Sequence, residues 1–217
     1  MSLFTQPYHD AVAQLTGPGA PFEVINCSIE GLSLKAFSQA HSSLSDYLNG
    51  GRQHGDKLLL QYQESTWSFK EFYTAADRLS HWLVTEGNIT AGTPVAIAMR
   101  NRPEWLIAFV AIINVGGIAV PLNSWGKSAE LEQGLEDSHA ALLICDAPRW
   151  KYVQESNRIV SALIVDGDAS GPQQPDFHDV IRANWTGAIT PPAIDTQSPA
   201  ILLFTSGTSG RPKGVML

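Results

Sequence analysis

The sequence predicts an α/β fold in which βαβ units form a parallel sheet flanked by helices. Two observations lead to this fold class: short runs of almost wholly apolar residues, and stretches of helical apolar spacing that alternate with them. Continuous apolar runs are typical of parallel strands whose two faces are both covered. Their alternation with amphipathic helices favours a parallel sheet with right-handed crossovers.

The first expected strand, at residues 57–63, leads into the first expected helix of this pattern. Ser68 and Glu71 have the spacing of a capping box, which marks the start of a helix. Apolar side chains then recur at helical spacing through Thr85, namely Phe69, Phe72, Ala76, Leu79 and Leu83. We interpret this stripe as the core-facing side of the helix.

The most apolar stretch, Trp105–Leu122, is long enough to resemble a membrane-spanning segment. An asparagine, a pair of glycines and a proline divide it, however. We therefore expect a buried helix that begins at Pro103 and breaks at the glycines, followed by a buried strand at 118–122. The sequence predicts no integral membrane segment.

The remaining elements are expected to be short. Ser128 is expected to cap a helix that ends near Ser138. Further strands are expected at 94–99, 141–145 and 161–165, a short helix at 150–154, and loops at 166–176 and 186–199. Residues 1–44 form an N-terminal segment in this interpretation, and residues 45–217 form part of one large domain.

Composition excludes some classes of partner. The 217-residue chain has a net charge of −7, which argues against nucleic acid as its main partner. Cys27 and Cys145 are far apart in the sequence and are expected to be buried free thiols in a reducing compartment. The N-terminus lacks the features of a signal peptide, so a cytoplasmic location is expected. The six histidines have no metal-like spacing, and no metal ligand is assigned.

The last sixteen residues carry the clearest indication of function. Two apolar runs flank a loop of hydroxyls and glycines that closes with Lys213. Glycines let backbone N–H groups converge on an anion, hydroxyls add donors, and a lysine adds a mobile positive charge. A Walker loop does not fit, because Pro212 and Gly214 replace its second glycine and its Ser/Thr. The pattern predicts a strand–loop–strand hairpin that binds a polyphosphate.

These residues resemble the signature of the adenylate-forming (AMP-binding) superfamily, which includes acyl-CoA synthetases, luciferases and peptide-synthetase adenylation domains. Pieces at 66–72, 95–105, 119–123 and 134–138 are similar to further family segments in the family's order. Asn123 with the nearby tryptophan, and the run at 134–138, look most like fatty-acyl-CoA synthetases. Peptide-synthetase adenylation domains are the second resemblance.

The resemblance implies an ATP-dependent acid–thiol ligase that converts a carboxylic, here fatty, acid to an acyl-adenylate and then to a thioester with coenzyme A. The cofactors implied are ATP, Mg²⁺ and coenzyme A. The residues expected to bind the ATP phosphates are Thr205, Ser206, Gly207, Thr208, Ser209, Gly210, Lys213 and Gly214. Arg211 falls at the family's variable position and is expected to face solvent.

No catalytic residue is assigned within the chain. The adenine site, the acyl pocket and the small C-terminal domain of a family member are expected downstream of Leu217, so the chain alone is expected to be inactive. Two alternatives remain open: an adenylation enzyme that passes the acyl group to a carrier protein, and a non-catalytic nucleotide-binding module. The second alternative predicts that the chain binds Mg·ATP by itself.

Overall fold

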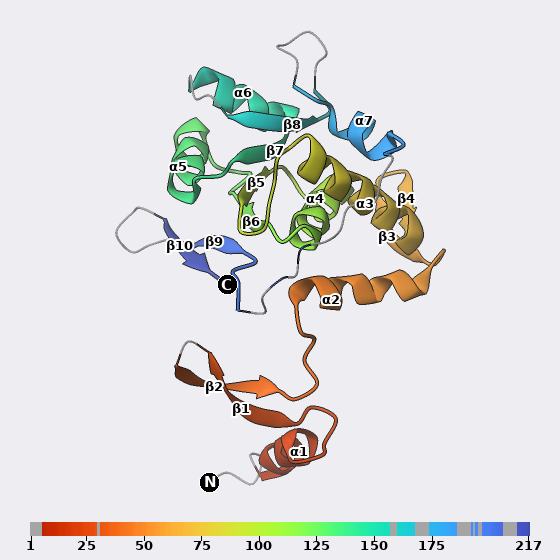
Figure 1. Ribbon diagram of the computed structural model, residues 1–217, viewed down its shortest axis with the longest axis vertical. Coiled ribbons are helices and arrows are strands. Elements are labelled where there is room, and N and C mark those ends of the chain that lie inside the picture. Colours follow the sequence, from red (N-terminus) through yellow and green to blue (C-terminus); the bar gives the residue numbers. More distant parts are fainter. Residues whose placement is uncertain are drawn as a thin grey trace. The chain divides into compact units, whose positions relative to one another are not determined.

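The computed structural model describes residues 6–29, 31–156, 160–167, 174–185, 192, 194, 197–205 and 212–217 (Figure 1). The chain divides into two compact units, Met1–Ser43 and Leu44–Leu217. The expected boundary at residue 44 remains a prediction about the domain of the whole protein.

The N-terminal unit contains one helix and one hairpin. Helix α1 spans Gln6–Thr16, and strands β1 (Val24–Ile29) and β2 (Leu32–Phe37) pair antiparallel. None of these elements is predicted from the sequence. Cys27, on β1, is partly exposed, so the expectation that it is buried is wrong. A two-stranded sheet that is not covered on both faces leaves its strands accessible to water.

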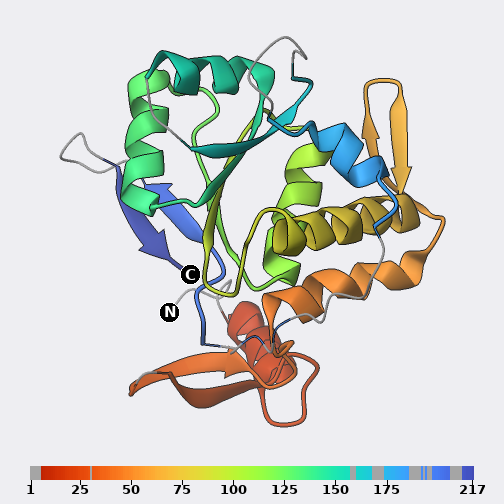
Figure 2. The same ribbon diagram turned by 45° about the horizontal axis from the view of Figure 1, so that its top comes forward.

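The second unit is built on a four-stranded parallel sheet, which confirms the predicted fold class. Its strand order is β6-β5-β7-β8, and all three strand pairs are parallel. The strands span Pro94–Ala98 (β5), Ile118–Pro121 (β6), Leu142–Asp146 (β7) and Ser161–Val165 (β8). Continuous apolar runs suit these strands, because helices cover both faces of the sheet, as Figure 2 shows.

The helices lie in two layers. On one face are α3 (Phe69–Thr85), α4 (Pro103–Asn114) and α7 (Phe177–Arg182); on the other are α5 (Ser128–Ser138) and α6 (Ala147–Glu155) (Figure 2). Each layer has its own apolar cluster. The predicted stripe of α3 lies in the first cluster with Phe177, and Leu131 and Leu135 of α5 lie in the second.

Two short helices and a hairpin precede this core. Helix α2 spans Leu44–Asn49 and the 3₁₀ helix η1 spans Gly50–His54; β3 (Leu58–Tyr62) and β4 (Ser65–Ser68) pair antiparallel. The capping box is confirmed, since the Ser68 hydroxyl accepts from the Glu71 N–H while the Glu71 carboxylate accepts from the Ser68 N–H. The Glu71 carboxylate accepts from both the Ser68 N–H and the Ser68 hydroxyl, and these two hydrogen bonds lower the pKa of Glu71.

The apolar stretch forms a helix and a strand, as predicted. Helix α4 has 12 residues and ends before the glycine pair, where Gly116 adopts φ of 72°. No helix among the described residues is long and apolar enough to cross a membrane.

Two helix starts differ from prediction, and the short helices α2, η1 and α7 are not predicted. Ser128 is not the cap of α5: Lys127 is the N-cap, and the Ser128 hydroxyl donates to the carbonyl oxygen of Tyr152 at 2.9 Å. Helix α6 begins earlier than expected because Asp146 caps it. Helix α7 follows Asp176, whose carboxylate accepts from the His178 and Asp179 N–H groups.

Candidate functional site

The predicted hairpin is present at the end of the chain. Strand β9 (Leu202–Thr205) pairs antiparallel with β10 (Lys213–Met216). Thr205 lies opposite Lys213, and the Thr205 hydroxyl donates to the Lys213 carbonyl oxygen at 3.4 Å. Both residues are exposed, so their polar groups are available where the loop of residues 206–212 begins and ends.

The sequence-predicted site residues divide into two groups. Thr205, Lys213 and Gly214 are brought together at the base of the loop. The others, Ser206, Gly207, Thr208, Ser209 and Gly210, lie outside the described residues, as does Arg211. Their role in phosphate binding stays a prediction.

Packing explains why a glycine occupies position 214. It lies opposite Phe204, and a Cβ atom built on Gly214 would lie only 2.9 Å from Cδ1 of Leu202. Leu202 and Phe204 pack against the second apolar cluster, beneath the strand pair. Gly214 therefore lets β10 cross the Leu202 side chain, which fixes the base of the loop.

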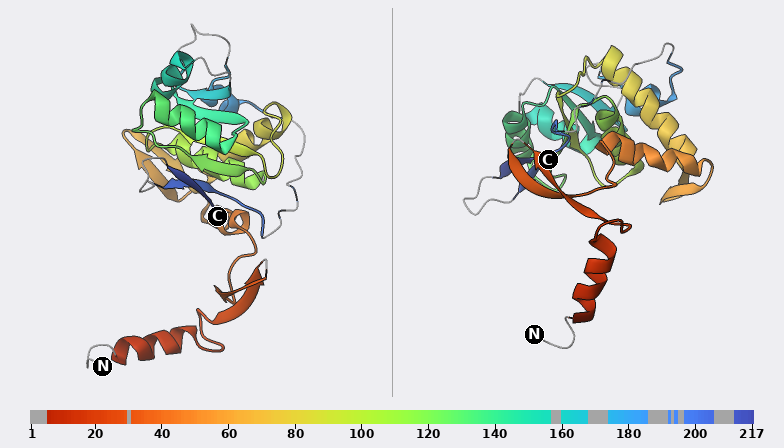
Figure 3. Two further views of the ribbon diagram at one scale, coloured as in Figure 1. Left: turned by 90° about the vertical axis from the view of Figure 1, so that its left-hand side faces the viewer. Right: turned by 60° about the horizontal axis from the view of Figure 1, so that its bottom comes forward.

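Backbone pairing sets the direction of the hairpin. Ile201 forms a parallel bridge with Ala119 of β6, and the Ala119 N–H donates to the Ala200 carbonyl oxygen at 2.9 Å. Figure 3 shows β9 beside the sheet. Because β9 runs in the same direction as β6, Thr205 lies toward the carboxyl ends of the parallel strands. Ligands of open α/β sheets bind outside these ends.

Polar residues follow the sheet strands at the same edge. Asp146, at the end of β7, accepts from the Arg100 N–H after β5 at 3.2 Å and from Arg149 Nη1 at 3.1 Å. Arg149 Nε in turn donates to the Ser124 carbonyl oxygen at 2.9 Å after β6. Asp146 and Arg149 are buried. This ion pair therefore connects the segments that follow three neighbouring strands.

A second charge cluster lies where β8 ends. Arg102 contacts Glu104 at 2.7 Å and Asp166 at 2.8 Å, and His178 contacts Asp166 at 3.1 Å. Burial alone would raise the pKa of Asp166, but the hydrogen bonds and charges of Arg102 and His178 outweigh it and lower that pKa. Burial lowers the pKa of Arg102, and its two carboxylate partners reverse that shift and raise it.

An exposed aromatic side chain completes this edge. Trp125 is 80% exposed, and the Arg100 guanidinium lies over its ring. Arg100 Nη1 is buried and has no hydrogen-bond partner among the described residues. Asn123 holds the loop, since its carboxamide oxygen accepts from the Trp125 N–H at 3.0 Å.

Our sequence prediction missed this polar edge, although a signal for it exists. Asp146 is the last residue of β7, Asp166 directly follows β8, and Arg100 comes two residues after β5. In a parallel sheet such positions share one edge, so their charge marks the edge at which ligands bind.

The described residues show little capacity for nucleophilic or metal chemistry. Burial raises the pKa of the Cys145 thiol, which disfavours the thiolate. Within the described part of the chain, no three His, Cys, Asp or Glu side chains gather as metal ligands would. The arrangement is suited to binding an anion through hydroxyl, backbone N–H and ammonium groups.

Comparisons with known proteins show the family to which this domain is similar. The family described as AMP-binding enzyme matches residues 49–217. The chain is 26% identical over 170 residues to N-(5-amino-5-carboxypentanoyl)-L-cysteinyl-D-valine synthase of Penicillium rubens, covering 77% of this chain and 4% of that protein. It is 25% identical over 176 residues to 4-hydroxybutyrate–CoA ligase 2 of Metallosphaera sedula, covering 76% and 32%.

A solved structure shares the fold. The anthranilate CoA ligase AuaEII, in complex with anthranoyl-AMP, superposes with a TM-score of 0.69 at 24% identity, over 79% of this chain and 34% of that chain. The chain thus spans about a third or less of the length of each protein compared.

Proposed function

Because the chain belongs to the AMP-binding (adenylate-forming) enzyme family, we propose that it forms the phosphate-binding part of an ATP-dependent acyl-CoA synthetase. The proposed reaction has two steps. A carboxylate, in our proposal that of a fatty acid, attacks the α-phosphorus of ATP to give an acyl-adenylate and pyrophosphate. The thiol of coenzyme A then attacks the acyl carbon and releases AMP. The proposed location is the cytoplasm.

The observation that carries this proposal is the pairing of Lys213 with Thr205 at the base of the loop. It leaves an exposed ammonium group and an exposed hydroxyl beside a loop of glycines and hydroxyls. Positioning and charge stabilisation supply most of the catalysis of such transfers. In this proposal Lys213 and the loop hold the β- and γ-phosphates, and Lys213 offsets the charge that develops on the departing pyrophosphate.

Mg²⁺ enters this proposal as part of the Mg·ATP substrate. The described residues do not gather the carboxylates that a resident Mg²⁺ would need. We therefore assign no step to a metal held by the described residues.

A second proposal keeps the adenylation but changes the acceptor. The match to the Penicillium synthase supports transfer to a carrier-bound thiol, whereas the match to the Metallosphaera ligase supports coenzyme A. Release of AMP that requires added coenzyme A supports coenzyme A as the acceptor. Release that requires a carrier protein, and not coenzyme A, supports the carrier-bound thiol.

Carboxylate-dependent ATP–pyrophosphate exchange tests adenylation. We would measure it with the full-length gene product across short to long fatty acids, and with residues 1–217 alone, for which no exchange is expected. Lys213→Ala should lower the exchange rate by about 100-fold or more, because it removes a charge that acts as pyrophosphate leaves. Lys57→Ala removes an equally exposed lysine outside the hairpin and should leave the rate unchanged.

The outcome can contradict each part of the proposal. Exchange that is equal in the two lysine variants would remove Lys213 from the phosphate site. Absence of exchange with every acid, together with Mg·ATP binding by residues 1–217, would favour the non-catalytic nucleotide-binding module.

A further inference from the structure

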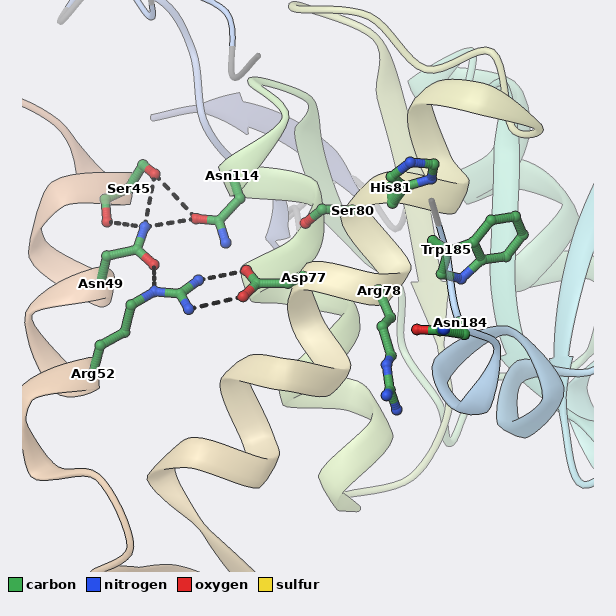
Figure 4. Close-up of a pocket in the computed structure, with 10 residues that line it drawn as sticks. All are labelled: Ser45, Asn49, Arg52, Asp77, Arg78, Ser80, His81, Asn114, Asn184 and Trp185. Carbon is green, nitrogen blue, oxygen red and sulfur yellow. Dashed lines mark hydrogen bonds and ion pairs between the residues drawn. The ribbon is translucent and has the colours of Figure 1, made fainter. Parts of the chain in front are cut away.

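A cavity lies beside helix α3, and no residue of the β9–β10 hairpin lines it. Its volume is about 410 Å³, within the range of small-molecule sites, roughly 300–1,000 Å³. It is lined by side chains from α2, η1, α3, the end of α4 and the segment after α7 (Figure 4). The α4 residue that lines the cavity, Asn114, lies at the end of the helix that precedes the amino end of β6. The hairpin loop begins toward the carboxyl ends.

One side of the cavity is a satisfied polar network. Arg52 forms two hydrogen bonds with Asp77, at 2.9 and 2.5 Å, and a third from Nε to Asn49 at 2.7 Å. Asn49 Nδ2 donates to Asn114 Oδ1 at 2.9 Å. This network connects α2 and η1 to α3 and α4, and the charges of Arg52 and Asp77 cancel. The network accounts for these side chains without any ligand.

The cavity also contains polar groups that donate to and accept from none of the described residues. His81 Nδ1 is buried and has no hydrogen-bond partner among the described residues. Asn114 accepts through Oδ1 from Ser45 and Asn49, and its own N–H groups donate to none of the described residues. A buried polar atom without a partner is costly, so His81 Nδ1 indicates a missing ligand or water.

Arg78 gives the cavity a net positive charge. Its Nη1 donates to the Ile181 carbonyl oxygen at 2.9 Å, and no carboxylate of the described residues forms an ion pair with it. Figure 4 shows its guanidinium turned away from the Arg52–Asp77 pair. The remaining N–H groups of a guanidinium match a carboxylate or a phosphate.

An aromatic stack forms part of the cavity wall. The rings of His81 and Trp185 are stacked, with centroids 5.4 Å apart and an interplanar angle of 23°. The Trp185 Nε1 donates to the Val180 carbonyl oxygen at 2.9 Å, which fixes the indole. Such a wall favours a flat ring over a flexible chain.

We propose that this cavity is a second ligand site, which binds a small anion that carries a flat ring. Arg78 binds the carboxylate or phosphate, the Asn114 amide and His81 Nδ1 form hydrogen bonds, and the ring lies against the His81–Trp185 stack. Aromatic carboxylates and nucleoside monophosphates share this chemistry. The site is independent of phosphate binding at the hairpin.

Binding to the 217-residue chain tests this site, with benzoate and AMP as the two probes and cyclohexanecarboxylate as an anion without a flat ring. Calorimetry gives the affinity, and Trp fluorescence reports the location, because Trp185→Phe should remove the change in signal. Arg78→Gln should weaken binding by about tenfold or more, since it removes a charged hydrogen bond. Arg182→Gln, an exposed arginine outside this cavity, is the matched control.

We expect at least one of benzoate and AMP to bind, more tightly than cyclohexanecarboxylate, and Lys213→Ala to leave that binding unchanged. Binding of benzoate alone identifies a carboxylate ligand, and binding of AMP alone identifies a phosphate ligand. The site is overturned if neither probe saturates the wild-type chain, in which case water fills the cavity. It is also overturned if Arg78→Gln and Arg182→Gln behave alike, or if Lys213→Ala abolishes AMP binding while Arg78→Gln does not.

Discussion

The sheet interior and the terminal hairpin are built in opposite ways. All five residues of β7 are buried, whereas all four residues of β10 are exposed. The sheet strands consist of apolar side chains that helices cover, and the hairpin carries glycines, hydroxyls and a lysine. The comparison teaches that the sheet interior carries stability, whereas the hairpin is free to carry the phosphate binding that we propose. Substitutions in the two regions should therefore affect different measurements.

The largest expected loss of stability comes from the sheet interior. Ile144 on β7 is fully buried, and Ile144→Ala should lower the free energy of unfolding by about 3–5 kcal/mol, because it removes packed atoms and leaves a cavity. Denaturant unfolding of the 217-residue chain measures this. Val215→Ala, on exposed β10, should cost less than about 1 kcal/mol. Equal losses would contradict the division between the two regions.

The buried ion pair at the carboxyl edge should have the next largest effect. Asp146→Ala leaves the buried Arg149 guanidinium without its carboxylate and removes the cap of α6. We expect a loss of about 3 kcal/mol in unfolding free energy. Asp146→Asn keeps a capping side chain and separates the two effects. If both variants match wild type, Asp146 does not hold the edge together.

A smaller effect is expected at the base of the hairpin. Gly214→Ala places a methyl group against Leu202 and should cost about 1–2 kcal/mol, as overpacking does. Gly50→Ala is the control, because a Cβ atom there meets no atom within 4 Å. Thermal unfolding measures both variants. A Gly214→Ala chain as stable as wild type would show that Leu202 moves aside freely.

The smallest expected effect is on pH dependence. The pKa of Asp166 is lowered in the folded chain, so its contribution to stability is present above the unfolded pKa, about 3.9, and is lost as pH falls through the folded pKa. Because its side chain is 59% exposed, the effect should be small. We would measure the unfolding free energy between pH 6 and pH 2.5. As the pH decreases, this free energy should fall less steeply in Asp166→Asn than in the wild-type chain. Identical slopes would refute the ion pair's contribution.

Periodicity predicted the second unit well, for a physical reason. The strand at 161–165 and the helix that ends at Thr85 have the predicted bounds. A strand buried on both faces needs a continuous apolar run, and a helix buried on one face needs apolar residues at helical spacing, so both patterns are clear in the sequence. The hairpin was predicted from turn and phosphate-loop chemistry, and its two strands are confirmed. Its loop residues 206–211 stay a prediction.

The errors have causes that the local sequence does not show. Ser128 has a hydroxyl suited to capping, but a carbonyl oxygen of a different helix accepts from it instead. Cys27 is apolar and resembles a buried residue, yet its strand belongs to a two-stranded sheet. Helix α7 is only six residues long, which gives too few turns for a periodic signal.

The sequence by itself determined the α/β class, the order of the sheet strands and of the longer helices in the second unit, and the strand–loop–strand hairpin. These follow from apolar periodicity and from short-range motifs, which act between neighbouring residues. Only the tertiary structure decided which strands are neighbours, that the hairpin joins the edge of β6, and that Arg78, Asn114 and Trp185 line one cavity. These contacts join residues that are far apart in the sequence, and only the packing of the core brings them together.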